Sequence, residues 1–182
     1  MNCLLTFFFL LSALLSTGVH AQGKASQQRD KDALAQWVQA NAQTPLSPSK
    51  ATSIVKHAYV NAFKNEMDPL LILSVIKVES GYRDKAVSSY GARGIAQVVP
   101  RWHKDKIKGR SLTNTAVSIE VGSQVLKDCS DKHRGNIRKA LGCYSGGGGK
   151  KYYNKVMAQK KSMRQDVMAS QNRSRPPLYA AL

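Results

Sequence analysis

Apolar residues recur every three to four positions through most of the chain, which is the period of helices that bury one face. The first clear case follows Ser47-Pro48, and its apolar positions are Ile54, Val55, Ala58, Tyr59, Ala62 and Phe63. Serine is a preferred helix N-cap, and proline is favoured at the first helical position. We therefore expect an amphipathic helix to begin at this dipeptide.

A second helix is predicted to begin at Asp68-Pro69 by the same device. The run from Leu70 to Val78 is apolar nearly all round, which is typical of a helix buried on every side. Its β-branched residues would also suit a short buried strand, but the Asp-Pro start and the length favour a helix. Gly81 predicts the end of this helix, and the Gly- and Ser-rich segment 82–109 predicts a structured loop.

Three further helices are predicted at 116–129, 136–144 and 150–168, with another helical segment at 32–42. A length of 182 residues suits one domain plus its ends. We expect an all-α protein with little or no β structure. Its predicted parts are a polar N-terminal extension (22–48), in which 22–31 is flexible, one domain (49–168) and a flexible tail (169–182).

The N-terminus has the pattern of a signal peptide. Residues 3–15 form an apolar run of the length of a signal-peptide core, shorter than the roughly 20 residues of a comfortable membrane span. Val19-His20-Ala21 offers a small-residue cleavage site after Ala21. We therefore expect residues 1–21 to be removed and the protein to be periplasmic or secreted. An uncleaved anchor is the alternative.

Charge adds an expectation about partners. The chain has 28 Lys and Arg against 11 Asp and Glu, a net charge of +17, so an anionic partner is expected. Export makes nucleic acid the least expected one and favours a cell-envelope polymer or membrane surface. The basic residues gather in the last helix, at Lys150, Lys151, Lys155, Lys160, Lys161 and Arg164. This face is either simply solvated or attracted to an anionic envelope surface.

Two cysteines remain once the signal peptide is removed, Cys129 and Cys143. An even count in an exported chain indicates a disulfide, with two unpaired buried thiols as the alternative. A zinc site that includes His133 would lack an obvious fourth ligand. We predict no metal and no cofactor.

Glu79 is the strongest candidate for chemistry, because it follows a buried apolar helix. A charged carboxylate is costly at such a place, so its pKa should rise, and a carboxylic acid that keeps its proton near neutral pH can act as a general acid. The alternative is a glutamate that turns into solvent from the helix end.

The sequence around Glu79 resembles a known catalytic core. The three segments are Glu79-Ser80-Gly81-Tyr82, Ala86-Val87-Ser88 and GARGIAQVVP at 91–100. They are similar to the E-S-x-F, A-V-S and G-A-x-G-L-M-Q-[IL]-M-P motifs of the family 1 lytic transglycosylases, whose SLT domains are related to goose-type lysozymes. Residues 140–147 resemble the family's A-x-x-Y-N-x-G motif. The resemblance spans residues 49–157 and implies a single lysozyme-like domain with Glu79 on a buried helix.

The resemblance also implies an activity. The substrate would be peptidoglycan, cleaved at the MurNAc-GlcNAc β-1,4 bond by a polysaccharide lyase with Glu79 as the single general acid and base. The muramoyl 6-hydroxyl would attack its own anomeric carbon, giving 1,6-anhydromuramic ends. The positions that the resemblance assigns to substrate binding or to steadying Glu79 are Ser88, Gln97, Tyr144, Ser145 and Tyr152. Ser145 stands where the family usually has Asn.

Three alternatives stay open at this point. Asp84 could hold a water molecule and make the protein a muramidase-type hydrolase, or it could be a solvated loop acid between Arg83 and Lys85. The chain could be a non-catalytic peptidoglycan-binding module of the same fold, or a cationic protein that disrupts membranes. The biological settings of small exported SLT domains include wall turnover, bacteriophage, and secretion and conjugation machines. In a secretion or conjugation machine, the other components would be partners.

Overall fold

The computed structural model describes residues 24–173. The signal peptide expected at 1–21 lies outside the described residues, as does the tail from residue 174 onward. Within the described part, no helix is both long enough and apolar enough to span a membrane.

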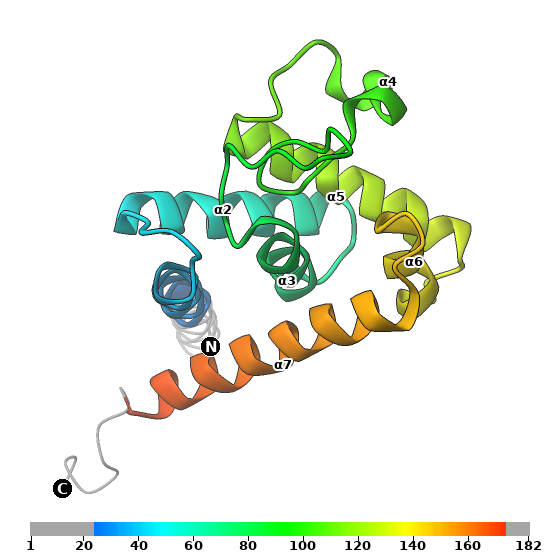
Figure 1. The fold of residues 1–182 in the computed structure, drawn as a ribbon. Helices are drawn as coiled ribbons and strands as arrows, with labels where there is room; N and C mark the ends of the chain where they lie inside the picture. Colours follow the sequence, from blue (N-terminus) through cyan, green and yellow to red (C-terminus); the bar gives the residue numbers. More distant parts are fainter. Residues whose placement is uncertain (1–23, 174–182) are drawn as a thin grey trace, which may run out of the picture.

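Helices dominate the described chain (Figure 1). A helix at 24–40 is followed by α2 (Pro48–Lys64), α3 (Pro69–Ser80), the 3-10 turn η1 (Pro100–Trp102), α4 (Lys104–Ile107), α5 (Thr115–Lys132), α6 (Ile137–Tyr144) and α7 (Gly149–Arg173). In place of strands, residues 24–173 contain two isolated antiparallel bridges, Val87 with Arg93 and Arg93 with Val98. The predicted all-α class with little or no β structure is confirmed.

The predicted starts of α2 and α3 are confirmed, and their caps explain them. The Ser47 hydroxyl accepts a hydrogen bond from the Lys50 amide, and the Asp68 carboxylate accepts one from the Leu70 amide. Each helix has proline in its first turn. α3 ends where Gly81 adopts a left-handed conformation with φ of 59°, which costs glycine less than any other residue.

α3 lies at the centre of the fold, between α2 and α7 (Figure 1). Ile72, Leu73 and Ile76 belong to a large core shared with α2 and α5, whereas Leu71 and Val75 face a smaller core shared with α6 and α7. Burial on two sides explains why the α3 sequence is apolar nearly all round. The buried helix therefore holds Glu79, in its last turn, at a fixed place.

The described chain is helical from residue 24 onward, whereas the helix was predicted to start at residue 32. The prediction of a flexible segment at 22–31 is therefore wrong for residues 24–31, and residues 22 and 23 lie outside the described residues. Its first turns are exposed and polar, and they carry no apolar periodicity that sequence reasoning could detect. Leu34, Trp37 and Val38 are buried in the large core. The Trp37 indole donates a hydrogen bond of 2.9 Å to Asp166 of α7, so the packed unit includes this helix.

α7 also differs from its predicted end at residue 168, because the helix continues to Arg173. The extra turn is mostly polar and gives no apolar period. Met163 and Val167 are buried against the large core and fix the preceding turns of the helix.

Candidate active site

Glu79 is half-buried in the last turn of α3, where α7 passes beside it. The Tyr152 hydroxyl, in the first turn of α7, donates a hydrogen bond of 2.5 Å to Glu79 Oε1. Glu79 Oε2 has no hydrogen-bond partner among residues 24–173. The carboxyl group is thus held through one oxygen while the other stays available to a ligand.

Burial raises the pKa of Glu79 above the ordinary glutamate value, and the hydrogen bond from Tyr152 lowers it by a smaller amount. The alternative of a glutamate turned into solvent does not fit this environment. A carboxyl group with a raised pKa keeps its proton to higher pH, which is the property needed in a general acid.

Two phenols accompany this carboxyl group. Burial raises the pKa of both Tyr152 and Tyr144, and the negative charge of Glu79 raises both further. Both rings therefore stay neutral hydrogen-bond donors. Tyr144, the last residue of α6, donates to the Ala96 carbonyl at 2.7 Å, so one phenol holds the carboxyl group and the other holds the neighbouring loop.

The loop between α3 and α5 is fixed to both helices. The Ser80 hydroxyl donates to the Ile95 carbonyl at 2.7 Å, and the Ser118 hydroxyl of α5 accepts from the Ala96 amide at 3.2 Å. The Gln97 side chain donates to the Ala86 and Gly94 carbonyls at 3.0 and 2.9 Å. Ser80 and Ser118 were not predicted as site residues, although Ser80 lies within the first motif of the resemblance.

Two glycines allow this loop to approach α5 closely. A Cβ atom on Gly94 would lie 1.9 Å from the Leu112 carbonyl oxygen, and the residue has φ of 79°. A Cβ on Gly122 of α5 would lie 2.5 Å from the Ala96 Cβ and 3.1 Å from the Tyr144 hydroxyl. Contacts this short exclude a larger residue unless the neighbours move, so both glycines set the position of the loop and of Tyr144.

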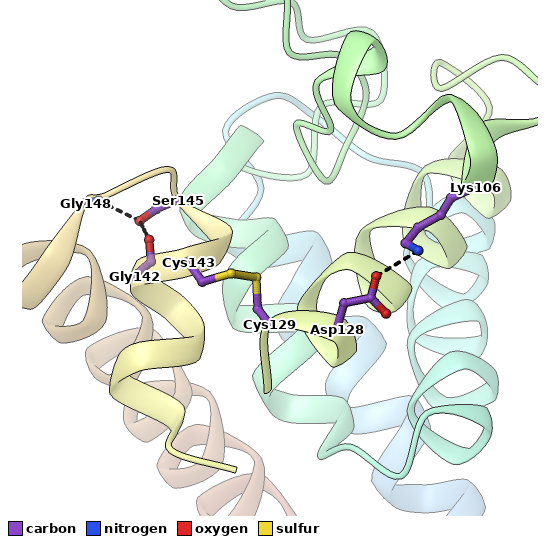
Figure 2. Close-up of a disulfide and its surroundings, with 7 residues drawn as sticks. All are labelled: Lys106, Asp128, Cys129, Gly142, Cys143, Ser145 and Gly148. Carbon is purple, nitrogen blue, oxygen red and sulfur yellow. Dashed lines mark hydrogen bonds and ion pairs between the residues drawn. A yellow bond between two sulfur atoms is a disulfide. The ribbon is translucent and has the colours of Figure 1, made fainter. Parts of the chain in front are cut away.

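The predicted site residues divide into two groups. Tyr144 and Tyr152 lie with Glu79, as described above. Ser88, Gln97 and Ser145 make hydrogen bonds to backbone groups of their own loops: Ser88 accepts from the Ala92 amide at 3.1 Å. Ser145 donates to the Gly142 carbonyl at 3.1 Å and accepts from the Gly148 amide at 2.9 Å, closing the turn after α6 (Figure 2).

Cys129 of α5 and Cys143 of α6 form a disulfide with their Cα atoms 5.7 Å apart (Figure 2). Both sulfurs are used in this bond, which leaves neither as a zinc ligand. Within residues 24–173, no cluster of three or more His, Cys, Asp and Glu side chains is arranged to hold a metal ion. The disulfide ties α6 to α5 directly beside Tyr144.

Asp84 has a different partner from Glu79. Its carboxylate forms an ion pair of 2.8 Å with Lys50, which also donates to the Thr115 hydroxyl at 2.5 Å. The hydrogen bond from Lys50 lowers the pKa of Asp84 below the ordinary aspartate value. Asp84 is therefore a paired carboxylate and a weaker base than a free one.

The architecture and the site together define a class. A buried central helix carries in its last turn a glutamate with a raised pKa, held by a phenol. A glycine-rich loop is bonded to the same end of this helix, within an all-α domain of lysozyme-like type. Residues 58–167 match the model of the transglycosylase SLT domain, and the chain belongs to this family. The family is of the lytic transglycosylase type and acts on peptidoglycan.

Proposed function

We propose that this protein is a peptidoglycan lytic transglycosylase that cleaves the MurNAc-GlcNAc β-1,4 bond and leaves 1,6-anhydromuramic ends. The observation that carries the proposal is the Glu79 carboxyl group, whose pKa is raised by burial, whose Oε1 is held by Tyr152 and whose Oε2 is uncommitted. Family membership supplies the substrate class.

The chemistry needs one carboxyl group in two protonation states. Glu79 first gives its proton to the glycosidic oxygen as the bond from that oxygen to the muramoyl C1 breaks, which leaves positive charge at C1. The resulting carboxylate then takes the proton of the muramoyl 6-hydroxyl as its oxygen bonds to C1. Glu79 ends protonated, as it began, and no water is consumed.

Tyr152 has a definable part in this cycle. Its hydrogen bond favours the carboxylate form of Glu79, which exists only between the two proton transfers, because hydrogen bonds to a charged acceptor are stronger than those to a neutral one. Burial favours the protonated form that begins the cycle. The opposing effects keep the carboxyl group able both to lose and to regain a proton.

The hydrolase alternative would place a water-activating base near the sugar. Asp84 is a poor base because Lys50 lowers its pKa, and its carboxylate is already engaged by that lysine. The alternative of a non-catalytic binding module is suggested by Ser145, which stands where the family usually has Asn. In the structure Ser145 closes a turn, and the bond between Glu79 and Tyr152 is made without it.

We further propose export to the periplasm or exterior, on the strength of the sequence at 1–21. Peptidoglycan glycan strands would be met there, in a secretion or conjugation machine, in wall turnover or in a bacteriophage. The basic face of α7 would meet an anionic envelope surface.

Digestion of purified sacculi with the mature chain tests the proposed reaction. Mass spectrometry should find muropeptides lighter by one water than their reducing-end counterparts, and the Glu79→Gln variant should release none. Products with reducing ends, lost in Asp84→Asn, would instead establish a hydrolase. Membrane leakage that survives Glu79→Gln, with no muropeptide released by either protein, would favour a cationic membrane-disrupting protein.

A further inference from the structure

A cleft of about 550 Å³ lies at the C-terminal end of α3 and is separate from the Glu79 carboxyl contacts. One wall is the segment that leads into α2, and the other is the segment that follows α3. The cleft lining includes Leu46, Lys50, Tyr82, Arg83, Asp84 and Lys85. Neither wall is used by the proposed reaction.

Both walls are fastened to the turn that carries Glu79. The Gln43 amide donates to the Gly81 carbonyl at 3.0 Å, and the Arg83 Nε donates to the Ser80 carbonyl at 2.9 Å. A Cβ on Gly81 would lie 2.6 Å from the Gln43 Cβ, so the two segments touch at this point. The cleft is therefore held at a constant position relative to Glu79.

The charge in the cleft is positive in excess. Lys50 and Asp84 neutralise each other through their ion pair. Arg83 uses only its Nε, which leaves its terminal guanidinium nitrogens without a partner among the described residues, and Lys85 is exposed with no hydrogen bond or ion pair there. Leu46 is half-buried and adds apolar surface beside these charges, whereas Tyr82 lies fully buried beneath the cleft. An anionic ligand with short apolar side chains matches this combination.

We propose that this cleft binds the acidic stem peptide of peptidoglycan, with Arg83 and Lys85 facing its carboxylates. The inference rests on the proposed function for the identity of the peptide. Arg83 follows Glu79 by four residues, so their Cα atoms are at most about 14 Å apart, which is also the length of an extended tetrapeptide. A stem that leaves the muramoyl residue near Glu79 can therefore reach the cleft.

A direct binding measurement tests the site without any cleavage. Calorimetry would use a synthetic stem tetrapeptide with free carboxylates, the same peptide with its carboxylates amidated, and inorganic phosphate as a simple anion. All proteins would carry Glu79→Gln, which prevents cleavage. Added to it would be Lys85→Gln, Arg83→Gln, or both substitutions together. Lys155→Gln, on the exposed face of α7, is the matched control for the loss of one positive charge.

The free-carboxylate peptide should bind, and the amidated peptide and phosphate should bind at least tenfold more weakly. One lost exposed charge should weaken binding roughly two- to fivefold, and the double variant about tenfold, while Lys155→Gln leaves binding unchanged. Asp84→Asn should tighten binding, since it removes the negative charge in the cleft. Equal binding of the free and amidated peptides, phosphate binding as tight as that of the peptide, or equal weakening by Lys155→Gln would overturn the proposal.

Cleavage assays separate this inference from the proposed function. On stem-bearing glycan, Lys85→Gln should raise KM while kcat and the cleavage of glycan stripped of its peptides stay unchanged. Peptide binding that is sensitive to Lys85, without cleavage of any glycan, would support the cleft and refute the enzyme. Cleavage of glycan, together with peptide binding that does not depend on Lys85 or Arg83, would support the enzyme and refute the cleft as the peptide site.

Discussion

Glu79 and Asp84 stand on either side of the turn that ends α3, yet their environments are opposite. Glu79 is half-buried beside two neutral phenols, and burial raises its pKa. Asp84 is paired with the Lys50 ammonium group at 2.8 Å, which lowers its pKa. The comparison shows that neighbours, more than residue type, decide which carboxyl group can serve as a proton donor.

The strongest way to break the comparison is Glu79→Gln. Glutamine keeps the size of the side chain but cannot give or take the proton, and general acid–base catalysis contributes about 10²–10⁴-fold. Because one group serves both proton transfers, we expect a loss of at least this size in the release of muropeptides, measured by chromatography.

The same variant has a predicted effect on stability. A folded-state pKa above the unfolded one gives a stabilisation that is present at low pH and lost as pH rises through the folded value. Glu79→Gln should therefore be more stable than the wild type at neutral and alkaline pH, with the difference shrinking in acid. Urea unfolding at several pH values measures this, and a variant less stable at neutral pH would contradict the burial of the carboxylate.

Removing the disulfide tests how far the bridge between α5 and α6, beside Tyr144, stabilises the Glu79 side of the comparison. Cys129 and Cys143 are 14 positions apart, and closing a loop of that size stabilises a fold by about 3 kcal/mol in the chain-entropy model. The double variant Cys129→Ala, Cys143→Ala should lose about this free energy of unfolding. An unchanged unfolding midpoint under reducing conditions would show that the bridge does not constrain the chain.

Tyr152→Phe sharpens the comparison by removing one hydrogen bond. Because the hydrogen bond from Tyr152 lowers the pKa of Glu79, its loss should raise that pKa further and shift the alkaline limb of the activity profile to higher pH. The pH dependence of cleavage measures this shift. Tyr153→Phe is a matched control on the next position of α7, and it should leave the profile in place.

Asp84→Asn should have the smallest effect. An ion pair with about a third of each side chain exposed contributes about 0.2–1 kcal/mol. Since the folded pKa of Asp84 is lowered, this stabilisation is present at neutral pH and is lost as pH falls through the folded value. Thermal unfolding at two pH values checks the sign, and activity on stem-free glycan should remain.

Much of the fold could be read from local sequence. Ser47-Pro48 and Asp68-Pro69 begin helices as predicted, and Gly81 ends α3 as predicted. The helical turns at 24–31 and 169–173 were missed because exposed polar residues leave no apolar period. The candidate glutamate was found because it follows a long apolar run, which is itself a local signal.

What the sequence alone determined were features encoded within a few neighbouring residues: caps, apolar faces, the buried α3 helix and the motifs around Glu79. Only the tertiary structure decided which distant groups meet. Tyr152 bonds Glu79 across 73 positions, and Lys50 pairs with Asp84 across 34. Such contacts depend on how α7 and α2 pack around α3, and packing is set by the complementary shapes of whole helix faces, which no short stretch of sequence contains.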